Sequence, residues 1–174
     1  MGQIKIKQIK TSYGELLLGS YEDKICLCDW VYRSMRSRID KRIQNGLKSS
    51  YLEGDSSLLK DLEQQLDEYF SKKRTDFNLP LLTVGTDFQN SVWEALQEIK
   101  YGQTWTYSDL AAQVGKSEAV RAVGSANGAN AISIIIPCHR IIGKGDSLGG
   151  YAGGLNTKRR LLELESQPLL DWGD

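Results

Sequence analysis

The stretch TYSDLAAQVGKSEAVRAVGSANG, residues 106–128, predicts two short helices joined by a tight turn. The first helix is expected to stop at Gly115, and Ser117 is expected to cap the second. Two short helices with a glycine-bearing turn are typical of a helix-turn-helix. Small residues dominate the second helix, so it can approach either DNA or another helix closely: Ala119, Ala122, Gly124, Ser125 and Ala126.

The segments on either side of this motif also have clear patterns. Upstream, TDFQNSVWEALQEI places Thr86 and Gln89 in capping-box spacing at the start of an amphipathic helix. Downstream, the apolar run SIII predicts a buried extended segment that ends at Pro137. NTKRRLLELE predicts a last helix, after the glycine-rich loop GKGDSLGGYAGGL.

The first half of the chain has a different pattern. IKIKQI, GELLLGSY and KICLCDWV predict strands of a small antiparallel sheet, and DSSLLKDLEQQLDEYF predicts an amphipathic helix that covers it. The polar segment SKKRTDFNLP, which ends at Pro80, is the best boundary between two domains. We therefore expect an α/β (α+β) protein with a sheet-plus-helix domain at residues 1–80 and a mostly helical domain at residues 81–174.

Composition sets the broad class. The 174 residues are 40% hydrophobic and carry no net charge, and no apolar run is long enough for a membrane span. The N-terminus does not resemble a signal peptide, so we expect a cytoplasmic protein. Three cysteines cannot build a disulfide framework. The sequence from Lys100 to Arg160 contains eight basic residues and three acidic residues. This excess of positive charge is compatible with phosphate binding.

The stretch IIPCHRII, residues 135–142, holds the only histidine beside a cysteine. A thiol reacts as thiolate, so Cys138 needs a base, and His139 could serve directly or through a water. A carboxylate that orients the imidazole could come from Glu163 or Glu165. Alternatively, Cys138 is a thiol packed in the core without a chemical role. We interpret Cys26 and Cys28 as core residues. We predict no metal site.

Several motifs together resemble the O6-alkylguanine-DNA alkyltransferases. They are GTDFQNSVWEALQEIKYGQTWTYSDLA, RAVGSANGAN, IPCHRII, GGYAGGL and KRRLLELE, and they cover about the C-terminal half in family order. The resemblance implies DNA repair: Cys138 takes the alkyl group from guanine O6 in a single, irreversible transfer. His139 would act through a water and Glu165 would hold it, Tyr107 would protonate guanine N3, and Asn130 would brace the nucleophile segment.

The resemblance also implies how DNA is bound. The second helix of the motif would enter the minor groove, and Arg121 would fill the space left by a flipped nucleotide. Ala122, Gly124, Ser125 and Ala126 would approach the backbone, and basic residues including Arg140 would contact phosphates. Tyr151, the backbone N–H of Ala152 and the carbonyls of Cys138 and Ile141 would line the base pocket. The partner would be double-stranded DNA with an O6-alkylguanine, bound with little sequence preference. The protein would act as a monomer without a cofactor.

The fold implied is a ribonuclease H-like N-terminal domain and a winged-helix-like C-terminal domain. The chain departs from the family in Ala131 and Lys100, where proline is usual, and in Ala152, which is serine in some relatives. Three other functions are possible for such a chain: a protein that flags the lesion, a thiol hydrolase and a DNA-binding regulator. A lesion-flagging relative would lack Cys138, a thiol hydrolase leaves Arg121 unexplained, and a DNA-binding regulator would not need the cysteine, histidine and glutamate.

Overall fold

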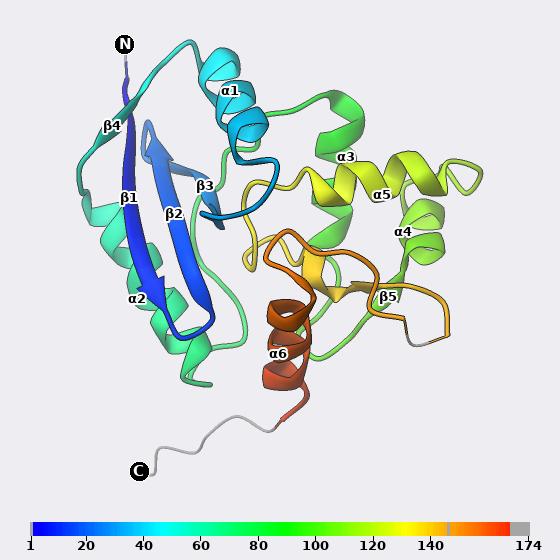
Figure 1. The fold of residues 1–174 in the computed structure, drawn as a ribbon. Coiled ribbons are helices and arrows are strands. Elements are labelled where there is room, and N and C mark those ends of the chain that lie inside the picture. Colours follow the sequence, from blue (N-terminus) through cyan, green and yellow to red (C-terminus); the bar gives the residue numbers. More distant parts are fainter. Residues whose placement is uncertain (1, 146, 168–174) are drawn as a thin grey trace.

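The computed structural model describes residues 2–145 and 147–167 (Figure 1). Its N-terminal half is built on a four-stranded sheet in the order β3-β2-β1-β4. Strands β1 (Ile4–Thr11), β2 (Gly14–Tyr21) and β3 (Lys24–Trp30) form the predicted antiparallel meander. The turn between β2 and β3 consists of Glu22 and Asp23, both with positive φ, which suits the right-handed twist of a hairpin.

The sheet is mixed, because it contains a fourth strand that was not predicted. A short fourth strand, β4 (Tyr51–Glu53), pairs parallel with β1. A parallel pairing needs a crossover connection, and helix α1 (Arg36–Leu47) supplies it. Helix α1 was not predicted because its sequence is mostly charged. Only Ile39 and Ile43 of this helix are buried, so it has little apolar periodicity.

Helix α2 (Ser57–Phe70) covers one face of the sheet, as predicted (Figure 1). The hydroxyl of Ser56 caps it by accepting from the N–H of Leu59. Its buried face begins with leucines and ends with an aromatic residue near the C-terminal half: Leu59, Leu62, Leu66 and Tyr69.

The C-terminal half is mostly helical. Helix α3 (Asp87–Leu96) starts with the predicted capping box of Thr86 and Gln89. Strand β5 (Trp105–Thr106) leads into α4 (Tyr107–Gln113), and α5 (Val120–Gly128) and α6 (Leu155–Ser166) follow. Gly115 has φ +72° after the end of α4, as its predicted role as a stop requires. The second helix of the motif begins at Val120, so the prediction of Ser117 as its cap was wrong.

The apolar run after α5 is buried, but it is not extended as predicted. Ile132 forms a single bridge to Cys28 at the edge of β3, and the chain then turns, with Ile134 at φ +73°. Sequence could not separate the two conformations, because an apolar run indicates burial and not backbone shape. The turn leads into a 3-10 helix, η1 (Cys138–Arg140), and strand β6 (Ile141–Ile142), which pairs parallel with β5.

The predicted α/β fold class is confirmed: a sheet with covering helices is followed by a helical half. One hydrophobic core includes residues from both halves, among them Leu18, Tyr69, Trp93, Ile136 and Leu161. Cys26 and Cys28 are buried free thiols, as predicted. Within residues 2–145 and 147–167, no helix has the length and apolar character needed to cross a bilayer.

Candidate active site

A cavity of about 250 Å³ opens beside Cys138. Cys138 is one of its lining residues and is only 4% exposed. Side chains from α4, α5, the glycine-rich loop and the N-terminal half meet here, and the cavity therefore unites segments far apart in sequence. Its lining includes Tyr107, Gly124, Cys138, Tyr151 and Ala152, together with Arg33, Ser34 and Met35.

Asn130 fixes the turn that delivers Cys138 to the cavity. Its side-chain amide donates to the carbonyl of Ile136 at 2.8 Å, and its carbonyl oxygen accepts from the N–H of Ile132 at 3.0 Å. Asn130 is buried, so these bonds satisfy backbone groups that water cannot reach. Burial raises the pKa of the Cys138 thiol, and the hydrogen bond of Asn130 to the thiol opposes this rise. The predicted bracing position of Asn130 therefore agrees with its placement.

His139 and Glu165 form a buried pair, although they lie on η1 and α6. Nε2 of His139 is 2.8 Å from Oε2 of Glu165. A carboxylate only accepts, so Nε2 carries the proton and Nδ1 holds the lone pair. Burial lowers the pKa of His139, and Glu165 opposes the change. Burial alone raises the pKa of Glu165, but His139 and Arg140 hold it well below its usual range.

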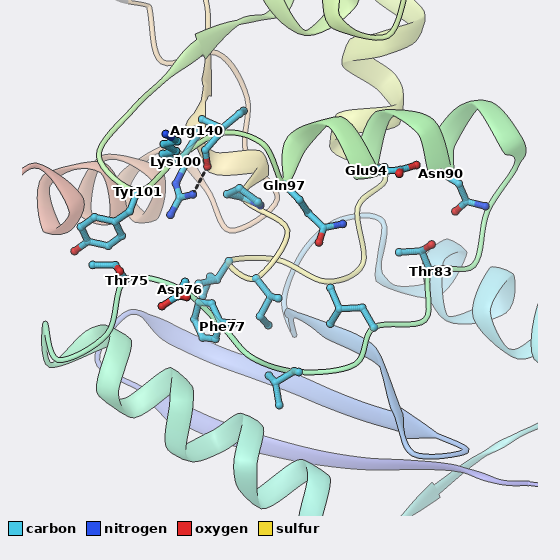
Figure 2. Close-up of a pocket in the computed structure, with 16 residues that line it drawn as sticks. Thr75, Asp76, Phe77, Thr83, Asn90, Glu94, Gln97, Lys100, Tyr101 and Arg140 are labelled. Atoms are coloured by element: carbon cyan, nitrogen blue, oxygen red, sulfur yellow. Dashed lines mark hydrogen bonds between the residues drawn. The ribbon is translucent and has the colours of Figure 1, made fainter.

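Arg140 belongs to this buried group, so its predicted role as a phosphate contact does not agree with its placement. Nε and Nη2 donate to the two carboxylate oxygens of Glu165 at 2.8 and 3.0 Å, and Nη1 donates to the carbonyl of Ile99 at 2.6 Å. Figure 2 shows Arg140 among the side chains that line a second pocket, with Tyr101 nearby. Counting charges along a sequence cannot reveal that a basic side chain is buried.

The glycine-rich loop is anchored from inside by Lys158 of α6. This fully buried ammonium donates to the carbonyls of Ile141, Leu148 and Gly150. Burial lowers its pKa to about 8. The carbonyl of Ile141 accepts from Lys158, and Ile141 is not among the residues that line the cavity. A carbonyl has two lone pairs, so the predicted contact of Ile141 with the base stays a prediction.

The N-terminal half contributes to the site through residues that pattern reading missed. Nε1 of Trp30 donates to the hydroxyl of Tyr151 at 3.0 Å, and so holds one wall of the cavity. Arg33 donates to the carbonyls of Gly128 and Asn130 on either side of the turn after α5. The buried carboxylate of Asp29 accepts from Arg33 at 3.0 Å. The spacing of Asp29 and Arg33, four residues apart, was the only available signal.

Helix α5 presents part of its predicted contact surface. Arg121, Ala122 and Ser125 are exposed, and Gly124 borders the cavity against the ring of Tyr107. Ala126 is 3% exposed, and its carbonyl accepts from Nε1 of Trp93 at 2.8 Å. Its predicted contact with DNA is therefore withdrawn, because this face of α5 packs on α3.

Comparison with known proteins identifies the family. The model of the ribonuclease-like domain of 6-O-methylguanine DNA methyltransferase matches residues 4–83, and the model of its DNA binding domain matches residues 87–167. A methylated-DNA-protein-cysteine methyltransferase of Methanosarcina barkeri is 43% identical over 92% of this chain and 96% of its own length. A constitutive one of Bacillus subtilis is 42% identical over 90% and 92%. The chain belongs to the 6-O-methylguanine DNA methyltransferase family, which confirms the predicted resemblance.

Solved structures agree. Mycobacterium tuberculosis OGT, crystallised in complex with DNA, superposes with a TM-score of 0.80 at 38% identity, covering 93% of this chain and 92% of that one. A second crystal structure from that organism, named O6-methylguanine methyltransferase, gives a TM-score of 0.79 at 36% identity over 99% and 97%.

Proposed function

We propose that this protein repairs DNA by direct reversal, moving a methyl or larger alkyl group from guanine O6 to Cys138 once and irreversibly. The observation that carries the proposal is the cavity that Cys138 lines together with Tyr107 and Tyr151. The predicted enzyme class, a methylated-DNA-protein-cysteine methyltransferase, is the one that the curated relatives carry in their names.

The transfer is a displacement at the alkyl carbon. The Cys138 thiolate forms the new S–C bond while the C–O6 bond breaks, and the electron pair of that bond passes to the guanine ring. Tyr107 donates a proton to N3, so the base leaves neutral. Burial raises the pKa of Tyr107, which keeps its hydroxyl protonated until it is used. The product is a thioether, and the protein is consumed.

His139 takes the thiol proton through one water. The hydrogen bond to Glu165 places the imidazole lone pair on Nδ1, and Nδ1 is buried without a partner among the described side chains. An accepting nitrogen in this state suits a bridging water, which connects the base to the thiol without direct contact. Because burial lowers the pKa of His139, the imidazole is neutral and able to accept a proton near pH 7.

DNA binds along α5 with the lesion turned out of the duplex. A buried thiol cannot reach O6 of a stacked guanine, so the nucleotide must be rotated into the cavity at a cost of a few kcal/mol. The exposed side chain of Arg121 fills the vacated stack from the minor groove, and Ala122 and Ser125 allow close approach to the backbone. The N–H of Ala152 binds O6. O4-alkylthymine is a second candidate substrate, and we expect a cytoplasmic monomer.

The variant Cys138→Ala separates binding from transfer. It should hold a duplex with O6-methylguanine as tightly as the unmodified protein while leaving the methyl group on DNA. Cys26→Ala, which removes a buried thiol of β3, should keep transfer. Repair by Cys138→Ala would make another thiol the acceptor and contradict the proposal.

A further inference from the structure

Tyr69 links the N-terminal half to the buried acid of the active site. It is the penultimate residue of α2, it is fully buried, and its hydroxyl donates to Oε2 of Glu165 at 2.5 Å. The same oxygen accepts from Nε2 of His139 at 2.8 Å. One carboxylate oxygen of α6 thus joins a helix of the N-terminal half to the proposed base.

The ring of Tyr69 is fixed by aromatic neighbours. Its centroid lies 5.4 Å from that of Phe70, 5.5 Å from Phe77 and 6.2 Å from Tyr101. Contacts of this kind hold a ring in place independently of its polar end. The hydroxyl is therefore presented to Glu165 by packing, and burial keeps it protonated by raising the pKa of Tyr69.

The hydroxyl competes with His139 for the charge of Glu165. Each hydrogen bond that a carboxylate accepts stabilises the charged form of the carboxylate. The carboxylate then attracts a further proton less strongly. Less attraction from Glu165 means that the imidazole of His139 stays neutral to lower pH. The other titratable or charged groups around this pair come from η1, α6, the segment after α3 and the glycine-rich loop: Cys138, Arg140, Lys158, Tyr101 and Tyr151.

We propose that Tyr69 is a positioning residue of the transfer reaction, whose hydroxyl binds the carboxylate oxygen of Glu165 that faces His139 and thereby keeps the imidazole neutral. This inference rests on the proposed role of His139 as the base. It assigns the N-terminal half a part in thiol activation, beyond support of the fold.

The test uses full-length Tyr69→Phe, which removes one oxygen and keeps the packed ring. Tyr101→Phe is the matched control, because its hydroxyl in the same aromatic cluster donates to the backbone carbonyl of Leu164 at 3.3 Å and not to the carboxylate. His139 is the only histidine of the chain, so NMR reports its titration as a single signal. The second readout is the single-turnover rate of methyl transfer as a function of pH.

Loss of the hydroxyl should raise the pKa of His139, by at most about one unit, because only part of the energy of the lost hydrogen bond to Glu165 is transmitted to the imidazole. The acid limb of the rate profile should move upward equally, slowing transfer up to about tenfold on that limb. Tyr101→Phe should change neither. An unchanged His139 titration, an equal slowing at every pH, or the same shift in Tyr101→Phe would overturn the inference. Absence of transfer in the unmodified protein would overturn the proposed function instead, and the titration would still decide the role of Tyr69.

Discussion

Nε2 of His139 and Oε2 of Glu165 lie 2.8 Å apart in a buried pair, although 26 positions separate the two residues in the chain. The pair fixes which nitrogen of the imidazole can accept a proton. It also carries the negative charge that balances Arg140, so it serves the chemistry and the fold together.

Glu165→Gln should lower the free energy of unfolding by about 3 kcal/mol, because Arg140 is left buried without its counter-charge. The pKa of Glu165 is lower in the folded protein than in the unfolded chain. Its contribution to stability is therefore present above about pH 4.3 and is lost as pH falls from there toward the folded pKa. Thermal unfolding across this range should show a weaker pH dependence in Glu165→Gln. Equal pH dependence in the two proteins would refute the assignment of the charge.

Tyr107→Phe should slow methyl transfer on the order of a hundredfold, because the guanine would leave without a proton donor. Binding to the lesion duplex should be unaffected, since the ring that borders Gly124 remains. Single-turnover kinetics and a binding titration measure the two properties separately. If transfer proceeds at the unmodified rate, the proton comes from another group.

Asn130→Ala should destabilise the protein by about 2–4 kcal/mol and slow transfer, because backbone groups of Ile132 and Ile136 lose their buried partner. Asn45→Ala, at an exposed position of α1, is the control and should change stability by no more than about 0.5 kcal/mol. Urea unfolding compares the two. Similar small losses in both variants would contradict the bracing role.

Arg121→Ala should slow repair in duplex DNA strongly and leave the reaction with the free base O6-methylguanine nearly unchanged. The side chain is exposed on α5 and makes no contribution to the cavity lining. Lys60→Ala, an exposed change on α2, controls for the loss of one positive charge. Equal losses on duplex and free base would count against a role of Arg121 in flipping the nucleotide.

Sequence motifs predicted the reactive residues of the site better than the residues that hold them in place. Cys138, His139 and Glu165 could be found because each stands in a motif with a recognisable order. Tyr69 was interpreted only as part of the apolar face of α2, since its partner is 96 positions away and periodicity carries no information about pairs. Arg140 and Ala126 were assigned to the surface for the same reason: residue type alone does not tell which face of a segment is buried.

The central claim is that Cys138 accepts the alkyl group and is used once. The most direct test is to mix the protein with a duplex containing one O6-methylguanine and then digest the protein. Mass spectrometry gives the mass of the peptide that contains Cys138. We predict that one methyl group replaces one hydrogen on that peptide, in at most one equivalent per protein. An unmodified peptide, or more than one repaired guanine per protein molecule, would contradict the account.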